Sequence, residues 1–319
     1  MELAGVPAVF FVSLCVFRGP LGITCFRCWP LAASLSAFLG LVMLLAAPVR
    51  GDEPQRLTSD GRLKFSPVFI DEDELVYTDF VNPTLYRLQR LKIDDLSIGP
   101  LHPDAKTSEL ESTFSPAGEY CAFVQTKGVL SLSVVIRNRR TKTDAVVPPA
   151  PGFAGMRSPA ISPDQSRVVY SFAEGGRQHL YSVDIEAGDQ QLLTSAGINN
   201  WPCFSPDGKR IIFSSTRHGN YEICMMNADG SGIRRLTNSQ MQDIRPRYSP
   251  DGKRIVFTSH RDGNYEIYVM KADGSGVRRL TKHPERDDYP TWHPAGDRIA
   301  FVGERSGRHD IYLMKVCMD

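Results

Sequence analysis

The sequence lacks an excess of either charge, and it lacks the short motifs of the common enzyme classes. Its 319 residues include 37 Lys and Arg against 36 Asp and Glu, a net charge of +1. Proteins that bind nucleic acid through its phosphates carry a clear positive excess, so we expect no nucleic-acid partner. No Gly-x-Ser-x-Gly, His-Glu-x-x-His or P-loop motif occurs. The usual signatures of α/β-hydrolases, zinc peptidases and P-loop nucleotide-binding enzymes are therefore missing.

Cysteine is scarce, which argues against a disulfide-built scaffold. Of seven cysteines, Cys25 and Cys28 form the one C-x-x-C spacing. Without a second pair this spacing does not predict a metal or redox site. The cysteines after the first 51 residues are Cys121, Cys203, Cys224 and Cys317. They lie in apolar runs and are predicted to be buried thiols, although an oxidising compartment would permit a Cys203–Cys224 disulfide.

Residues 1–51 have the composition of an export leader. The apolar run Leu31–Ala47 has 17 residues, follows Arg27, and ends in small residues. This layout is typical of a signal peptide, and the run is slightly short for a membrane span. We predict a signal peptide cleaved after Gly51, or alternatively an uncleaved N-terminal membrane anchor. The protein is then exported, and is periplasmic, secreted or held at the membrane by its leader.

The remainder, residues 52–319, is built from an internal repeat. Two segments, starting at Phe204 and Tyr248, share the sequence Ser-Pro-Asp-Gly-Lys-Arg-Ile, then Tyr-Glu-Ile, then Arg-Leu-Thr. Weaker copies keep the same frame around a proline. The frame prolines are Pro67, Pro116, Pro163, Pro206, Pro250 and Pro294, spaced by 49, 47, 43, 44 and 44 residues. This period predicts an all-β, six-bladed β-propeller with four-stranded blades.

Two features of the repeat predict how the ring is arranged. The first strand carries a proline at each end, as in Pro246–Pro250. Since proline removes a ladder donor, this strand is predicted to be the inner edge, facing the channel. The last repeat ends without Arg-Leu-Thr, and that sequence occurs instead within Gln55–Thr58. We therefore predict that the N-terminal strand completes the last blade and closes the ring.

The repeat resembles the WD40-like PD40 repeat of the TolB-like propeller family. The likeness covers about residues 55–319 and is strongest over residues 199–319. It implies a non-catalytic protein-binding scaffold of the cell envelope, serving Tol-Pal-type lipoprotein docking or envelope integrity and transport. TolB also has an α/β domain before its propeller and an N-terminus that engages TolA. Few residues separate the leader from the first repeat here, so we do not expect a TolA-type contact.

The resemblance also implies the partners. An envelope protein such as a peptidoglycan-associated lipoprotein is expected, with a glycan as a second ligand class. The alternatives are a polysaccharide-lyase-like enzyme working in the channel and the binding module of a peptidase system, because PD40 repeats also occur in such proteins. We expect a monomer without a cofactor, whose only membrane contact is an uncleaved leader. An enzyme requires a convergent cluster of titratable groups, whereas a scaffold requires a broad contact face.

The loops on one face of the ring predict the binding surface. Arg217, Arg261 and Arg305 recur in register after the second strand. They form either a partial ring of cations or, as the simpler alternative, pairs with the carboxylates Glu222, Glu266 and Asp310. The candidate binding residues are Asn199, Asn200, Trp201, Arg217, Asp243, Arg245, Arg261, Asp287, Asp288, Tyr289 and Arg305. Mixed charge, amides and aromatic rings are suited to protein or glycan recognition.

Other polar clusters have structural interpretations. The seven histidines do not occupy equivalent repeat positions, and Asp71–Glu74 lacks the spacing of a calcium loop. No metal site is predicted. The recurring aspartates after the first strand, Asp164, Asp207 and Asp251, are predicted to form Asx turns. One position of the third strand is predicted to lie in the blade core. It is occupied by Tyr86, Tyr181, Tyr268 and Tyr312, with Cys224 in the fourth repeat.

Overall fold

The computed structural model describes residues 53–127, 131–149 and 155–316. The regular elements in these ranges are β-strands. No helix capable of crossing a membrane occurs among them. The predicted leader, residues 1–51, lies outside the described residues.

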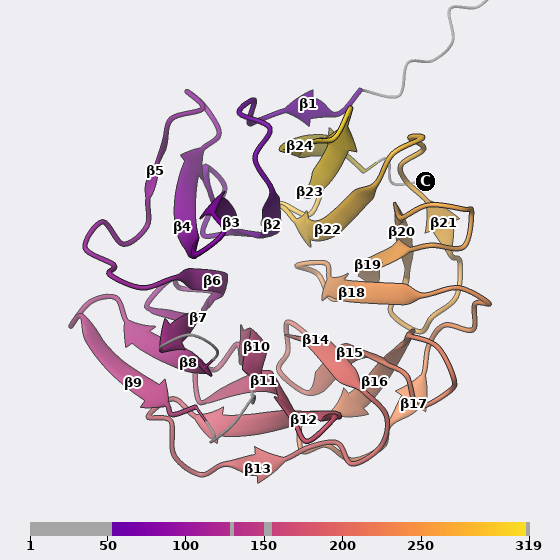
Figure 1. The fold of residues 1–319 in the computed structure, drawn as a ribbon. Helices are drawn as coiled ribbons and strands as arrows, with labels where there is room; N and C mark the ends of the chain where they lie inside the picture. Colours follow the sequence, from indigo (N-terminus) through magenta and orange to yellow (C-terminus); the bar gives the residue numbers. More distant parts are fainter. Residues whose placement is uncertain (1–52, 128–130, 150–154, 317–319) are drawn as a thin grey trace, which may run out of the picture. The chain divides into compact units, whose positions relative to one another are not determined.

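Each repeat contributes strands in a fixed order from the channel outward (Figure 1). The inner strands are β2 (Lys64–Phe69), β6 (Glu109–Phe114), β10 (Gly155–Ile161), β14 (Asn199–Phe204), β18 (Asp243–Tyr248) and β22 (Asp287–Trp292). The second strands are β3 (Glu74–Asn82), β7 (Tyr120–Lys127), β11 (Arg167–Glu174), β15 (Arg210–Ser215), β19 (Arg254–Ser259) and β23 (Arg298–Arg305). The third strands are β4 (Leu85–Lys92), β8 (Ser131–Asn138), β12 (Arg177–Asp184), β16 (Glu222–Asn227), β20 (Glu266–Lys271) and β24 (Arg308–Lys315). The short outer strands are β1 (Gln55–Arg56), β5 (Ile98–Pro100), β9 (Thr143–Val147), β13 (Gln191–Leu192), β17 (Arg234–Arg235) and β21 (Arg278–Arg279).

These strands form a propeller, but they do not divide into six separate sheets as the sequence predicted. Four sheets have four strands each: β2–β5, β14–β17, β18–β21, and β1 with β22–β24. The strands β6–β13 form one eight-stranded sheet. A parallel pair between Gly155 of β10 and Leu132 of β8 joins its two halves. One local backbone contact between neighbouring repeats therefore joins two sheets that the sequence predicted to be separate.

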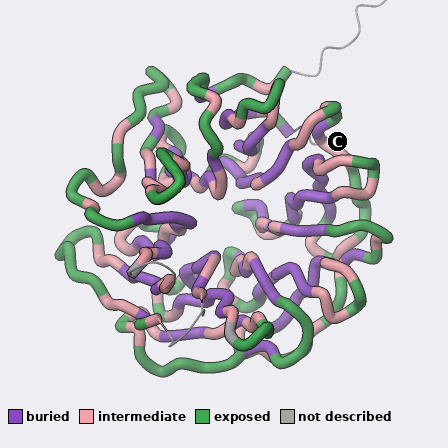
Figure 2. Tube along the Cα trace, viewed as in Figure 1, coloured by how far each residue is buried: buried purple, intermediate pink, exposed green. Residues whose placement is uncertain are grey.

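The inner strands surround the centre, as the paired prolines predicted. Each inner strand contacts the next around the ring, and β22 contacts β2. The apolar core lies between successive sheets rather than in the channel. One cluster, for example, joins Ile212 and Ile223 of one sheet to Ile255 and Phe257 of the next. Figure 2 shows the exposed chain concentrated at the outer rim and in the loops.

Every inner strand contains a β-bulge near its middle, at which one residue is left-handed. The residues with positive φ are Ser66, Glu111, Ser158, Trp201, Arg245 and Tyr289, with φ between 50° and 55°. Proline follows in each repeat except at Glu111. Such backbone conformations are costly for non-glycine residues and are retained where the surrounding structure imposes them. The bulge also interrupts the pairing of the inner strand with the second strand, which resumes beyond it in a shifted register.

The N-terminal strand closes the ring, as predicted. Strand β1 pairs with β24, with Gln55 opposite Leu313. Next to it, the buried carboxylate of Asp310 accepts a hydrogen bond from Thr58 Oγ1 at 2.8 Å and one from Arg56 Nε at 3.2 Å. Leu57 is 3% exposed and packs in a core cluster that contains residues of β3, β4, β23 and β24. Backbone pairing, charge and apolar burial thus act together at one junction.

We expect deletion of Gln55–Thr58 to lower the melting temperature by several degrees or more. The single substitution Leu57→Ala should cost about 2–5 kcal/mol of the free energy of unfolding, because it empties a buried leucine site. Thermal and urea unfolding followed by circular dichroism would measure both effects. Glu53→Ala, at an exposed position just before β1, is the control. A deletion variant that melts like the parent protein would contradict closure by β1.

The cysteines of the described residues are free thiols. Cys203 and Cys224 cannot approach each other, because they pack in different core clusters on opposite faces of the β14–β17 sheet. Burial raises the pKa of Cys121 to about 12 and that of Cys224 to about 11. Both thiols are fully buried, whereas Cys203 is partly exposed.

We therefore predict that a maleimide at pH 8 leaves Cys121 and Cys224 unmodified in the folded protein. Almost no thiolate is present at either site at this pH, and the reagent cannot reach them. Peptide mass spectrometry would follow each cysteine separately, with the partly exposed Cys203 as internal comparison. Modification of all three at equal rates before denaturant is added would refute this arrangement.

Candidate functional site

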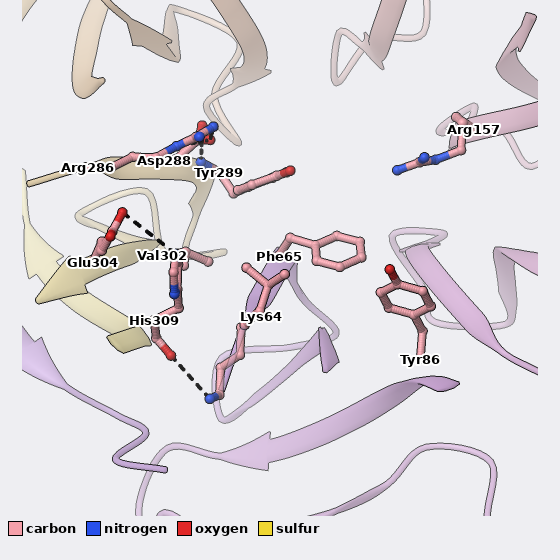
Figure 3. Close-up of a pocket in the computed structure, with 11 residues that line it drawn as sticks. Lys64, Phe65, Tyr86, Arg157, Arg286, Asp288, Tyr289, Val302, Glu304 and His309 are labelled. Atoms are coloured by element: carbon pink, nitrogen blue, oxygen red, sulfur yellow. Dashed lines mark hydrogen bonds and ion pairs between the residues drawn. The ribbon is translucent and has the colours of Figure 1, made fainter. Parts of the chain in front are cut away.

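A cavity of about 310 Å³ opens where the inner strands β2, β10 and β22 begin. Its lining residues are Leu63, Lys64, Phe65, Tyr86, Arg157, Arg286, Asp288, Tyr289, Val302, Glu304 and His309. Figure 3 shows the ends of Arg157 and Tyr289 pointing toward each other across it. The rings of Phe65 and Tyr86 meet edge to face, with centroids 5.8 Å apart. We call this cavity the channel mouth.

An arginine held between two aromatic rings lies beside the channel mouth. The guanidinium carbon of Arg245 is 4.5 Å from the centre of the Trp201 ring and 4.0 Å from that of Tyr289. Arg245 also donates a hydrogen bond to Tyr289 Oη at 3.0 Å and one to Asp288 at 3.2 Å. Trp201, Arg245 and Tyr289 are bulge residues with positive φ. Together with Ser66, another bulge residue, they line one small cavity. The bulges therefore bring side chains of separate repeats together at the centre.

Asp288 is the buried anion of this group. It forms ion pairs with Arg245 and Arg286, and it accepts hydrogen bonds from Thr258 Oγ1 at 2.9 Å and from the Tyr289 backbone N–H at 2.8 Å. Burial by itself would raise the pKa of Asp288. The two arginines outweigh burial and hold this pKa below its ordinary value. Asp288 is therefore a fixed negative charge at neutral pH.

Buried Glu111 of β6 forms a second ion pair, with Arg157 of the neighbouring inner strand β10. Arg157 donates to Glu111, and the Ser158 backbone N–H donates to the same carboxylate at 2.7 Å. Burial opposes ionisation of Glu111, but Arg157 lowers its pKa below the ordinary value. The carboxylate in turn raises the pKa of Arg157. Both groups stay charged.

The arginines that recur after the second strand do not form a ring of free cations. Arg261 binds Asp243 at 2.8 Å, Arg305 binds Asp287 at 2.7 Å, and Arg217 donates to Asn199 at 3.1 Å. Each partner is the first residue of an inner strand. The predicted pairing with the third-strand carboxylates was wrong. These contacts tie the loop after the second strand to the start of the inner strand.

The third-strand carboxylates bind the threonine of the Arg-Leu-Thr sequence instead. Thr237 donates to Glu222 at 2.6 Å, Thr281 to Glu266 at 2.5 Å, and Thr58 to Asp310 at 2.8 Å. Each threonine hydroxyl also accepts the backbone N–H that follows the carboxylate residue. Arg279 also binds Glu266 at 2.8 Å, and Arg56 binds Asp310, so these two carboxylates are engaged without Arg261 and Arg305.

The predicted binding residues thus separate into two groups. Trp201, Arg245, Asp288 and Tyr289 meet at the centre, as described above. Asn199, Arg217, Asp243, Arg261, Asp287 and Arg305 form the loop-to-strand pairs. Asn200 donates to Tyr221 Oη at 3.1 Å and accepts from Gln178. The members of the second group bind partners within the fold.

Sequence reasoning missed several residues of the channel mouth and its supporting ion pair: Lys64, Phe65, Tyr86, Glu111, Arg157 and Arg286. The assignment of Tyr86 to the blade core was wrong. Tyr86 lies opposite Phe80 near the hairpin end, whereas Gln89, opposite Tyr77, occupies the equivalent repeat position. The cause is the proline of the first repeat: Pro67 follows the bulge residue Ser66, as Pro202 follows Trp201, so it is not equivalent to Pro206 and the predicted frame of this repeat was wrong. The available signal was the proline that follows the bulge, Pro67 in the first repeat and Pro159 in the third, because it places Phe65 and Arg157 on inner strands.

The acidic turns have the structural role that the sequence predicted. Asp207 accepts the Lys209 backbone N–H at 3.1 Å, and Asp251 accepts that of Lys253 at 3.0 Å. Asp164 accepts the N–H of Ser166 at 3.1 Å. Asp71 likewise accepts backbone N–H groups at 2.9 and 2.8 Å. Among the described residues, no three His, Cys, Asp or Glu side chains are grouped to hold a metal ion.

The family model described as the TolB beta propeller domain (PD40) matches residues 68–244 and 238–318. The chain belongs to this family. Among curated proteins, an uncharacterised protein of Agrobacterium fabrum is 37% identical over 27% of this chain and 29% of its own length. The Tol-Pal system protein TolB of Hamiltonella defensa is 31% identical over 22% of this chain and 17% of its own length. The similarity thus spans less than a third of each relative.

Solved structures share the fold at low sequence identity. A TolB candidate from Agrobacterium tumefaciens has a TM-score of 0.63 and 21% identity, covering 82% of this chain and 93% of that one. TolB from Acinetobacter baumannii has a TM-score of 0.62 and 21% identity, covering 76% and 64%. Oligogalacturonate lyase from Vibrio parahaemolyticus has a TM-score of 0.54 and 14% identity, covering 82% and 93%. At such identities the likeness shows the fold alone.

The buried charge of Asp288 predicts a pH-dependent effect of its substitution. Because the folded-state pKa of Asp288 is lowered, the stability it contributes is present above its unfolded pKa and is lost as the pH falls through the folded value. Asp288→Asn should therefore lower the melting temperature at pH 7. The difference from the parent protein should shrink below about pH 4.

Melting curves between pH 2.5 and pH 7 would measure this difference. Asp94→Asn, at an exposed turn between β4 and β5, is the matched control. It should follow the parent protein throughout. A difference between Asp288→Asn and the parent that stays constant across this range would show that Asp288 is not held as a buried anion.

Proposed function

We propose that this propeller is a non-catalytic scaffold that binds an envelope protein at the channel mouth. The observation that supports this proposal is the composition of the cavity. It brings Phe65, Tyr86 and Tyr289 together with Arg157 and Arg286. Tyrosine and arginine carry a large share of the binding energy in protein interfaces, particularly in well-packed pockets near the centre of the contact.

The electrostatics of the channel mouth favour binding over catalysis. A general acid or base works best when its pKa lies near the working pH. The buried carboxylates Asp288 and Glu111 are instead held ionised by arginines, with pKa values below the ordinary range. Their lone pairs are engaged by arginine, hydroxyl and backbone donors. These groups therefore serve to fix arginine and aromatic side chains in place.

The partner we propose is a peptidoglycan-associated lipoprotein, within a system of the Tol-Pal type. Family membership and the short matches to TolB sequences support this choice. The role requires an exported protein, so residues 1–51 would be a signal peptide or an anchor, and the propeller would be periplasmic or secreted. We take it to act as a monomer, and we count six blades by treating the eight-stranded sheet as two blades, β6–β9 and β10–β13.

We predict that Tyr86→Ala weakens binding of this lipoprotein at least tenfold. Truncating an aromatic residue in the central pocket of an interface typically costs about 2 kcal/mol or more. Affinity capture from detergent-solubilised envelope would identify the partner, and calorimetry with the purified partner would give the dissociation constant. Leu192→Ala, which removes an exposed side chain on the outer strand β13, should change it less than twofold. Equal affinities for both variants would exclude the channel mouth.

Alternatively, the protein is a carbohydrate-active enzyme of the polysaccharide-lyase kind, which can be tested with the same purified chain. The fold likeness to oligogalacturonate lyase is what supports it. It predicts cleavage of an acidic oligosaccharide by the purified chain and loss of that cleavage in Arg157→Ala. If the chain binds the oligosaccharide without cleaving it, its function would be glycan recognition and not catalysis. The further possibility, a binding module of a peptidase system, predicts capture of a peptidase in place of the lipoprotein.

A further inference from the structure

A second cavity, of about 770 Å³, lies between the loop that precedes β6 and the turn that follows β8. Basic side chains from separate segments line it: Arg90, Lys106, Arg137, Arg139 and Lys142. None of these residues belongs to the channel mouth. We call this cavity the basic cleft, and its volume lies within the usual range of small-molecule sites.

Nearby carboxylates balance part of the positive charge of the basic cleft, and one of its arginines, Arg90, is paired with Glu74 at 3.8 Å. Buried Glu109 interacts with His102, with Oε2 2.7 Å from Nδ1. Asp144 binds Arg137 through two hydrogen bonds of 2.7 Å each. Across the part of the chain that the structure describes, Lys106 and Lys142 have no ion-pair partner. Arg139 likewise lacks a carboxylate partner there. Exposed Asp104 is the remaining acidic side chain that lines the cleft.

Two of the arginines are held in place and keep unused donors. Arg137 is fixed by Asp144, and its guanidinium lies 5.2 Å from the centre of the Phe123 ring. Arg139 donates one hydrogen bond to the Gly118 carbonyl at 2.7 Å and lies 5.3 Å from the Phe114 ring centre. A guanidinium has five N–H donors in a planar fork that matches phosphate and carboxylate oxygens. Ordering these side chains on a ligand would cost little entropy.

The sequence of the turn departs from the repeat at this position. In the fourth repeat the corresponding turn reads Asn227-Ala-Asp-Gly-Ser231, whereas here it reads Asn138-Arg-Arg-Thr-Lys142. Both turns begin with an asparagine that ends the third strand. The turn itself therefore does not require cations. Their presence here is not explained by folding of the repeat.

We propose that the basic cleft binds a small molecule with several closely spaced anionic groups, phosphates or carboxylates. Lys106, Arg139 and Lys142 supply the charge, and Arg137 supplies a fixed guanidinium. The apolar side of the cleft, with Leu101 and Ala105, contacts the body of the ligand. The site is separate from the channel mouth and does not depend on the proposed lipoprotein binding.

Calorimetry on the full chain at about 50 mM ionic strength tests this site, with tripolyphosphate and citrate as probes. The double variant Lys106→Ala with Lys142→Ala should weaken binding of the favoured probe at least tenfold. Lys209→Ala with Lys253→Ala removes the same charge from exposed turns of other repeats and should weaken it less than twofold. The affinity should also fall as salt is added.

The two probes identify the chemistry of the ligand. Selective binding of tripolyphosphate assigns the basic cleft to phosphate esters, and selective binding of citrate assigns it to polycarboxylates. Circular dichroism melting would verify that both double variants fold, because neither change removes a buried side chain. Absence of binding by either probe, or equal weakening by the two double variants, would overturn the proposal.

Discussion

The closure of the ring by β1 is the constraint on which the rest of the molecule depends. Residues 55–58 and the third strand of the last repeat lie about 250 positions apart in the sequence, and they meet around the buried carboxylate of Asp310. In the fourth and fifth repeats a threonine bridges the carboxylate and the next backbone N–H, and Thr58 does the same for Asp310 in the last. At the ring closure, the same threonine–carboxylate hydrogen bond joins the N-terminal strand to the last repeat. Without it, β24 would be an open edge.

Closure fixes the distance of each inner strand from the centre, and the bulges determine what occupies the centre. The left-handed residues bring Trp201, Arg245 and Tyr289 of successive repeats into direct contact. Backbone strain at these positions is offset by cation–π contacts and by the ion pairs of Asp288 and Glu111. The result is a fixed arrangement of arginine and aromatic groups beside an open cavity. Such an arrangement is suited to a preorganised contact surface, because little order is lost from the free protein on binding.

The two cavities differ in the way their charges are balanced. At the channel mouth, Asp288 and Glu111 match their arginines closely, so recognition there would depend on shape and aromatic contact. In the basic cleft, Glu109 is engaged by His102, Asp144 by Arg137 and Glu74 by Arg90, and the side chains of Lys106, Arg139 and Lys142 face solvent. A charged ligand is the natural counterpart of the second arrangement. One propeller can therefore present two sites of different chemistry on a common scaffold.

The propeller, the inner strand and the closure by Gln55–Thr58 could be predicted from the sequence, because repeats and turn prolines are local signals of a fixed period. It also identified Trp201, Arg245, Asp288 and Tyr289 as candidates on one face. The structure was needed for the partners of Arg261 and Arg305, because Asp243 and Asp287 are each 18 positions away, whereas the competing Glu266 and Asp310 are nearer in sequence. The position of Tyr86 and the joined eight-stranded sheet also needed the structure, because it shows that Pro67 follows a bulge and that Gly155 pairs with Leu132. Convergence of Arg157, Tyr86 and Tyr289 arises from ring geometry, which no single repeat contains.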